Sequence, residues 1–398
     1  MSERKPLRVA MIGTAFMGRA HSQAWHTAPR FFDLALEPVP AVIVGTSAKR
    51  TEEQARMLGW AEASTDWRAV VERDDIDLVD ICSPGDTHAE IAIAALESGK
   101  HVLCEKPLAN SVEEAERMVG AAERAFAMSA SIAMCGFSYR QTPALSLARQ
   151  FIAEGRLGAI RHVRASYLQD WLSDADAPLS WRLDRSKAGS GSLGDIGAHS
   201  IDIAQWLTGQ AIVEVSATMR TFVADRPMGV AAAGLGGVAI GGAPRGPVTV
   251  DDAVAFTATL SGGALGVFEA TRMATGRRNA NRVEVNGDRG SVAFDFERMN
   301  ELEYFDGRSV DKRAEGFRRI LVTDPTHPYA SNWWPTGHGL GYEHLFTHQV
   351  VDVVRAVADR AVPSPSFAEA LDVQRVLAAV QASSAARSMA TTVKRTPE

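Results

Sequence analysis

Two carboxylates and an imidazole lie within an otherwise small and apolar stretch, residues 190–209 (SGSLGDIGAHSIDIAQWLTG). On a helix that turns by about 100° per residue, Asp195, His199 and Asp202 fall within roughly 60° of one another. One face of such a helix could then offer acid–base groups to a polar ligand. The structural alternative is that Asp195 caps the helix and His199 is a buried, hydrogen-bonded histidine. The stretch alone leaves both open, and we expect Asp202, one turn further on, to be structural.

A lysine lies where open α/β sheets bind their ligands. Lys106 lies at the end of HVLCEKP (101–107), which we predict to be a parallel strand, and ligands bind at the carboxyl ends of such strands. The alternative is a solvated lysine at a strand end. The sequence lacks the Tyr-x-x-x-Lys motif of short-chain dehydrogenases, because no tyrosine has a lysine four residues later. It also lacks the clustered ligands of zinc dehydrogenases, because the three cysteines are scattered. We therefore expect no metal site.

The sequence GTAFMG (13–18) follows the first apolar run and opens the first helical pattern. A glycine-rich turn between a strand and a helix N-terminus is typical of dinucleotide binding, because the helix amides face the pyrophosphate. Ala15 stands in the second glycine position, where its methyl group adds bulk. The alternative is a tight turn without a ligand. The predicted cofactor contacts are Gly13, Ala15, Phe16, Met17 and Gly18.

The end of the second predicted strand indicates which dinucleotide is bound. NAD-specific folds place an acidic residue there, on the ribose 2′-hydroxyl, but no carboxylate occurs between residues 42 and 51. Thr46, Ser47 and Arg50 suit a 2′-phosphate, so we expect NAD(P) with a preference for NADP over NAD. The alternative is that Lys49 and Arg50 are solvated residues that open a helix.

The order of elements defines the fold class, which is α/β. Up to about residue 140, strand and helix patterns alternate, which predicts a doubly wound parallel sheet. Beyond it the pattern predicts an α+β domain with a large, mostly antiparallel open sheet, so we expect domains at 1–140 and 141–398, with the C-terminal helices able to pack back on the first domain. A glycine- and alanine-rich loop is expected at 228–247. The predicted strands are 7–13, 40–46, 77–84, 101–107, 131–139, 159–171, 212–223, 253–260, 264–273, 281–286 and 290–296, and the last helices are 342–359 and 367–388.

Composition and charge exclude several classes of partner. The chain has 398 residues and a net charge of −6, which argues against nucleic acid and anionic membranes. No apolar run reaches the ~18 residues of a membrane span, and the N-terminus does not have the pattern of a signal peptide. We expect Cys82, Cys104 and Cys135 to be buried, reduced thiols in a cytoplasmic protein.

Taken together, the motif at 13–18, Glu105-Lys106-Pro107 and Asp195-x-x-x-His199 resemble the Gfo/Idh/MocA oxidoreductases over nearly the whole chain. The resemblance implies an N-terminal Rossmann domain, hydride transfer between NAD(P) and a sugar or cyclitol, and a homodimer or homotetramer formed through the open sheet. It makes Lys106, Asp195 and His199 the catalytic set. The resemblance also implies a cis peptide bond before Pro107. Its further implied cofactor contacts are Ser83, Pro84, His88, Glu105, Lys106 and Pro107.

Other stretches resemble pyranoside-oxidising members of the family, namely FSYRQTPA (137–144), SYLQDW (166–171), LSWR (179–182) and THPY (326–329). This resemblance implies substrate contacts from Tyr139, Gln169, Trp171 and His327, beside Asp195 and His199. Residues 45–50, by contrast, resemble NADP-dependent anhydrosugar reductases. Two other functions stay open, namely NAD-dependent redox-assisted glycoside cleavage and a dinucleotide-binding regulator without catalysis.

Overall fold

The structure is a computed structural model that describes residues 4–228, 242–308 and 311–394. The chain divides into two compact units, each formed from two separate segments. The first unit consists of Met1–Ser138 and Gly341–Leu371, and the second of Tyr139–Leu340 and Asp372–Glu398. The chain therefore returns to the first unit after residue 340 and enters the second unit again at residue 372. Within the described residues, no helix has the length and apolar character needed to cross a membrane.

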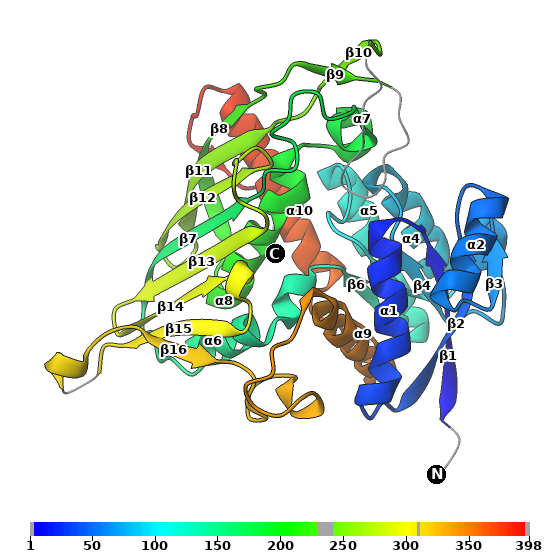
Figure 1. The fold of residues 1–398 in the computed structure, drawn as a ribbon, viewed down its shortest axis with the longest axis horizontal. Helices are drawn as coiled ribbons and strands as arrows, with labels where there is room; N and C mark the ends of the chain where they lie inside the picture. Colours follow the sequence, from blue (N-terminus) through cyan, green and yellow to red (C-terminus); the bar gives the residue numbers. More distant parts are fainter. Residues whose placement is uncertain (1–3, 229–241, 309–310, 395–398) are drawn as a thin grey trace. The chain divides into compact units, whose positions relative to one another are not determined.

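The first unit is built on a parallel sheet with strand order β3-β2-β1-β4-β5-β6 (Figure 1). Every residue of β4 is buried, as expected for a parallel strand covered on both faces. The strands are β1 (Lys5–Ile12), β2 (Leu36–Val44), β3 (Glu62–Ser64), β4 (Leu78–Ile81), β5 (His101–Cys104) and β6 (Ala133–Cys135). The helices are α1 (Phe16–Phe31), α2 (Ala48–Leu58), α3 (Trp67–Val71), α4 (His88–Glu97), α5 (Val112–Ser129) and α9 (Tyr342–Asp359).

The second unit is built on a mixed sheet with strand order β16-β15-β14-β13-β7-β12-β11-β8-β17. All neighbouring pairs are antiparallel except β7 and β12, which run parallel. The strands are β7 (Ile160–Leu168), β8 (Ile212–Arg220), β11 (Ala253–Leu260), β12 (Leu265–Thr271), β13 (Ala280–Gly287), β14 (Gly290–Asp295), β15 (Glu301–Asp306), β16 (Arg318–Leu321) and β17 (Thr391–Thr392). The helices are α6 (Pro143–Ala153), α7 (Arg185–Ala188), α8 (Ala198–Thr208) and α10 (Phe367–Ala385), the last of which begins in the first unit.

One face of this sheet packs against helices α6 and α8. Along β11, buried and exposed residues alternate, which is the pattern of a sheet covered on one side. The strands also line a hollow of about 780 Å³, with Arg164, Thr257, Val267, Glu284 and Asp295 among its lining residues.

The predicted fold class is confirmed, and the differences are local. The strand expected at 131–139 is limited to β6 and is followed by a 3₁₀ turn, Ser138–Gln141. Strands β3, β15, β16 and β17 and helices α3 and α7 were not expected. Most of the predicted loop at 228–247 lies outside the described residues, but its flanks pair as a two-stranded ribbon, β9 (Asp225–Pro227) with β10 (Arg245–Pro247). Cys82, Cys104 and Cys135 are buried, as expected, and form no disulfide within the described residues.

Candidate functional site

The glycine-rich turn after β1 is folded so tightly that two of its residues must be glycine. Gly13 has φ +116°, and a Cβ there would lie 2.6 Å from the backbone of Cys82. A Cβ on Gly18 would lie 2.2 Å from the carbonyl oxygen of Gly13. Helix α1 starts at Phe16 without a side-chain cap, so the amides of its first turn are available to an anion. The turn therefore fits the pyrophosphate of a dinucleotide.

The segment after β2 carries basic and hydroxyl groups. Thr46 and Arg50 are exposed and Ser47 is half-buried. Ser47 precedes α2 but its side chain does not cap the helix. Among the described residues, Arg50 has no hydrogen bond or ion pair. These side chains are therefore accessible to a ligand.

His88 joins the turn after β4 to the Glu-Lys-Pro turn after β5. Its ring nitrogens lie 2.9 Å from the carbonyl oxygen of Ser83 and 3.0 Å from that of Pro107. Burial lowers the pKa of His88, although both carbonyl contacts oppose that shift. Its contacts thus support a role in fixing both turns, and direct contact with a cofactor stays a prediction. The Lys106-Pro107 peptide is cis, as expected.

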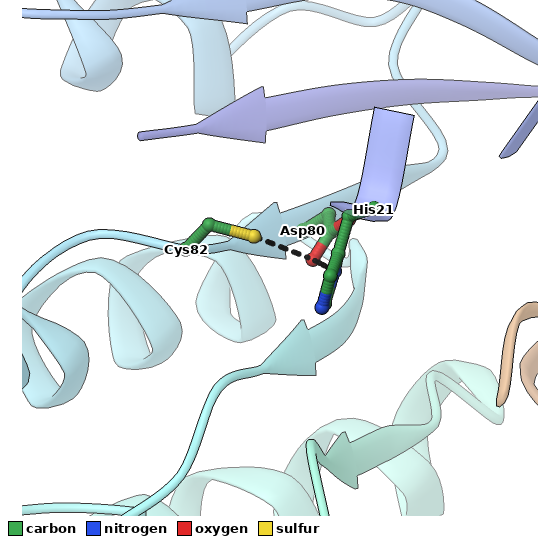
Figure 2. Close-up of side chains that lie close together, drawn as sticks. All are labelled: His21, Asp80 and Cys82. Atoms are coloured by element: carbon green, nitrogen blue, oxygen red, sulfur yellow. Dashed lines mark hydrogen bonds and ion pairs between the residues drawn. The ribbon is translucent and has the colours of Figure 1, made fainter. Parts of the chain in front are cut away.

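A buried polar cluster below the Glu-Lys-Pro turn was not predicted. Nδ1 of His21 lies 3.0 Å from both carboxylate oxygens of Asp80, and its Nε2 lies 3.1 Å from Oε1 of Glu105. The indole of Trp25 donates to Asp80 at 2.7 Å, and the thiol of Cys82 lies 3.6 Å from Asp80. Figure 2 shows how His21, Asp80 and Cys82 meet. Polar residues on a buried helix face and strand were the only signal in the sequence.

In the second unit, Asp195 lies in a short π-helical turn, Leu193–Gly197, that runs into α8. The expected spacing of 100° per residue is therefore wrong for this part of the stretch. The carboxylate of Asp251 fixes the turn by accepting from the backbone of Gly191 (2.7 Å) and Leu193 (2.8 Å) and from the hydroxyl of Ser192 (2.6 Å). Single π-helical turns are frequent at functional sites.

Arg272 holds Asp195 from inside the unit. Its Nη1 lies 3.2 Å from Oδ2 of Asp195, and its guanidinium is 5.5 Å from the ring centre of Trp171. Arg182 is close enough to influence both charges: burial is the main cause of its lowered pKa, which Asp195 opposes and Arg272 reinforces. Two arginines, Arg272 and Arg182, thus surround Asp195 with positive charge. The Asp195 carboxylate accepts the hydrogen bond that Arg272 donates.

A chain of hydrogen bonds runs from the indole of Trp171 to the phenol of Tyr139. Trp171 donates to Gln169 (3.0 Å), Gln169 to Asn279 (2.8 Å) and Tyr167 to Asn279 (2.7 Å). The hydroxyls of Tyr139 and Tyr167 are 2.5 Å apart. Burial raises the pKa of Tyr139 to about 12, so its phenol stays protonated at neutral pH.

This chain reaches His199, because the rings of Tyr139 and His199 pack edge to face with centres 4.7 Å apart. The second unit therefore brings Tyr139 beside His199, and Trp171 beside the Arg272–Asp195 pair. His327 lies on another loop, where its ring accepts from the backbone of Asp324 at 3.2 Å. Within the described part of the chain, His327 makes no hydrogen bond or ring contact with the other predicted substrate residues.

Asp202 is structural, as expected. Its carboxylate accepts hydrogen bonds from two nitrogens of the buried Arg140, Nη2 at 2.5 Å and Nε at 2.9 Å. The side chains of Arg140 and Asp202 are 4% and 1% exposed, so this pair fixes α8 and offers nothing to a ligand.

The two units combine a dinucleotide-type sheet with a domain that presents acid–base side chains, which is the organisation of a two-domain oxidoreductase. Residues 7–131 match the model of the "Oxidoreductase family, NAD-binding Rossmann fold". Residues 145–293 match the "GFO/IDH/MocA C-terminal domain". The chain belongs to the GFO/IDH/MocA family of oxidoreductases.

Individual relatives resemble the chain over nearly its whole length. Levoglucosan dehydrogenase of Pseudarthrobacter phenanthrenivorans is 42% identical over 386 residues, which cover 96% of this chain and 97% of the relative. A crystal structure of an oxidoreductase domain protein from Kribbella flavida is 58% identical, with a TM-score of 0.93 and coverage of 98% and 100%. A structure of levoglucosan dehydrogenase in complex with NADH and levoglucosan is 39% identical, with a TM-score of 0.91 and the same coverage.

Proposed function

We propose that this protein is a dehydrogenase that oxidises a secondary hydroxyl of a pyranose sugar or anhydrosugar. The observation that carries the proposal is the π-turn and α8, on which the partly exposed carboxylate of Asp195 precedes His199 by four residues. Aromatic and amide groups of Tyr139, Gln169 and Trp171 lie beside them. Such a mixture suits a ligand with apolar ring faces and many hydroxyls. The resemblance to levoglucosan dehydrogenase supports the same substrate class.

The side chains divide the reaction between them. When bound, the nicotinamide supplies the hydride acceptor. His199 takes the hydroxyl proton, since an imidazole titrates near neutral pH. Lys106 hydrogen-bonds the reacting oxygen and stabilises the negative charge that develops there. In the reverse direction, His199 returns the proton to the oxygen of the ketone.

Other groups hold the sugar. Asp195 accepts a hydrogen bond from a neighbouring hydroxyl, because Arg272 fixes its carboxylate from behind. Trp171 covers an apolar face of the ring, and Gln169 offers both a donor and an acceptor to its edge. His327 is kept as a further substrate contact. The proposed cofactor contacts are those predicted from the sequence.

The cofactor is a nicotinamide dinucleotide of the kind that this NAD-binding family uses. A preference for NADP is a finer proposal. The absence of an acidic side chain after β2 and the accessible Arg50 support it, whereas the related levoglucosan dehydrogenase structure contains NADH. Three buried cysteines that form no disulfide within the described residues suit a reducing compartment, so we propose a cytoplasmic location.

The test is a substrate panel with purified protein. Levoglucosan, glucosides, glucose and inositols are each incubated with NAD⁺ or NADP⁺, and reduced nicotinamide is followed by absorbance. We expect turnover with a pyranose or anhydrosugar, and its loss in the Lys106→Ala variant. Cleavage of a glycoside without added nicotinamide, or cofactor binding without any turnover, would contradict the proposal.

A further inference from the structure

The buried cluster of His21, Asp80 and Glu105 has more acidic groups than one histidine balances. The side chains of His21, Asp80 and Glu105 are 1%, 0% and 6% exposed. Each ring nitrogen of His21 faces a carboxylate, Nδ1 at 3.0 Å and Nε2 at 3.1 Å. An ionised carboxylate accepts only, so both nitrogens donate and the ring is an imidazolium when both acids are charged.

The surroundings of His21 favour the charged ring. Burial lowers the pKa of His21, but its interactions with Asp80 and Cys82 together outweigh burial and raise that pKa well above its usual value. The other titratable groups that face the ring are Glu105 and the thiol of Cys82, whereas α9 presents the aromatic ring of Phe346. Burial raises the pKa of Cys82 to about 12, so its thiol stays neutral.

A metal ion is the alternative occupant of this cluster, since a histidine nitrogen, a carboxylate oxygen and a thiol lie within 4.8 Å of one another. However, the atoms that would bind a metal ion already take part in hydrogen bonds. The carboxylate of Asp80 accepts hydrogen bonds from the ring of His21, the indole of Trp25 and the thiol of Cys82. A neutral thiol is also a poor metal ligand. The hydrogen-bonded network is therefore the reading that the contacts support.

The network leads directly to the backbone of Lys106. Oε2 of Glu105 accepts from the backbone N–H of Lys106 at 3.2 Å, while Oε1 faces His21. The backbone of Gly136 packs against this carboxylate so closely that a Cβ at Gly136 would lie 2.7 Å from Oε1. His88 holds the carbonyl of Pro107 on the other side of the turn.

We propose that His21, an imidazolium held between Asp80 and Glu105, is a positioning residue that fixes the backbone of Lys106 for hydride transfer. The proposal rests on the proposed catalytic role of Lys106. The network ties α1, which carries the glycine-rich turn at its start, to the ends of β4 and β5. A small displacement of a reacting group can cost about 10²-fold in rate, so a group that never touches substrate can matter this much.

The first test is spectroscopic and does not depend on activity. The ring nitrogens of ¹⁵N-labelled protein are observed by NMR, and His21 is assigned by comparison with His21→Gln. We expect both nitrogens of His21 to carry protons from pH 6 to pH 8.5. A ring that loses a proton near pH 6.5, or a stoichiometric metal ion that disappears in His21→Gln, overturns the proposal.

The second test separates positioning from simple stability. We expect His21→Gln and Glu105→Gln to lower kcat by about 10²-fold, with the KM for the dinucleotide changed less than the kcat. The control is His26→Gln on the same helix, whose ring contacts the carbonyl of Leu58 at 2.8 Å, and it should keep wild-type kcat.

If His21→Gln does not fold, Glu105→Gln carries the kinetic test. Wild-type kcat in a folded variant overturns the positioning role, even where the NMR result stands. A wild-type protein that oxidises no sugar would instead overturn the proposed function, which keeps the two failures distinct.

Discussion

Arg272 and Asp195 form an ion pair whose partners differ in exposure. The side chain of Arg272 is 0% exposed and that of Asp195 is 27% exposed, with 3.2 Å between Nη1 and Oδ2. The carboxylate is therefore bound by a buried cation and is itself partly exposed. A buried arginine is costly unless it is paired, so the pair places a fixed acceptor where a ligand can reach it.

Arg272→Lys should weaken substrate binding. Lysine keeps the charge but lacks the planar guanidinium that reaches Asp195 and lies over Trp171. Loss of a hydrogen bond to a charged group costs about 1.5–3 kcal/mol, so we expect kcat/KM for the sugar to fall by roughly 10- to 150-fold. Dinucleotide affinity should be unchanged. Arg220→Lys, at an exposed position on β8, is the control, and equal kinetics in both variants would exclude this role.

His199→Ala tests the proposed base. We expect kcat for oxidation to fall by about 10²–10⁴-fold, the usual contribution of a positioned acid–base group. The Kd of the dinucleotide, measured by fluorescence, should barely change. The control is His338→Ala, an exposed histidine that bonds the carbonyl of Pro335. Near-normal kcat in His199→Ala together with inactive Lys106→Ala would make Lys106 the proton acceptor.

Arg50→Ala tests the cofactor preference. If Arg50 binds a 2′-phosphate, its removal should cost about 1.5–3 kcal/mol in NADP binding and leave NAD binding unchanged. Titration calorimetry with both dinucleotides measures the difference. Arg56→Ala, in the last turn of the same helix, is the matched control. A wild-type preference for NAD, or equal losses for both cofactors, would show that the expectation from residues 45–50 is wrong.

Val267→Glu tests self-association through the open sheet. Val267 lies on β12, is 42% exposed and lines the hollow on the sheet. An apolar side chain at the centre of an interface tolerates a charge poorly, so the variant should elute as a smaller species in size-exclusion chromatography with light scattering. Val362→Glu, at an exposed position in the first unit, should behave as wild type. A monomeric wild type would contradict the prediction.

The stability of the protein should fall in alkaline solution because of His21. Its pKa is raised in the folded state, so its contribution to the free energy of unfolding is complete below the unfolded value near 6.5. That contribution is lost as the pH rises from this value through the folded pKa. The difference in unfolding free energy between wild type and His21→Gln should therefore be larger at pH 6 than at pH 9 in urea titrations. A difference that grows with pH would contradict the charged ring.

Local patterns predicted most of the fold. Helix α9 has the bounds expected from its helical pattern, 342–359. The strands expected at 253–260 and 264–273 pair as β11 and β12, and those expected at 281–286 and 290–296 pair as β13 and β14. These features depend on neighbouring residues, which is why the sequence reveals them.

The site was harder to predict because it depends on residues that are distant in sequence. The π-helical turn at Asp195 is fixed by Asp251, 58 to 60 residues from the groups it binds. Arg272 reaches Asp195 across 77 residues. A regular helical spacing does not contain such contacts. The catalytic and binding residues themselves came from a resemblance, and their roles stay predictions.

The return of the chain to the first unit bears on how this enzyme can be recombined. Phe346 of α9 packs on His21 of α1, with ring centres 5.4 Å apart, and His348 packs on Phe32. A gene fragment that ends at residue 138 would leave this apolar surface of α1 uncovered and prone to aggregate. Exchange of the nucleotide half between relatives therefore needs breakpoints at 138/139, 340/341 and 371/372, and single-crossover chimaeras should be insoluble.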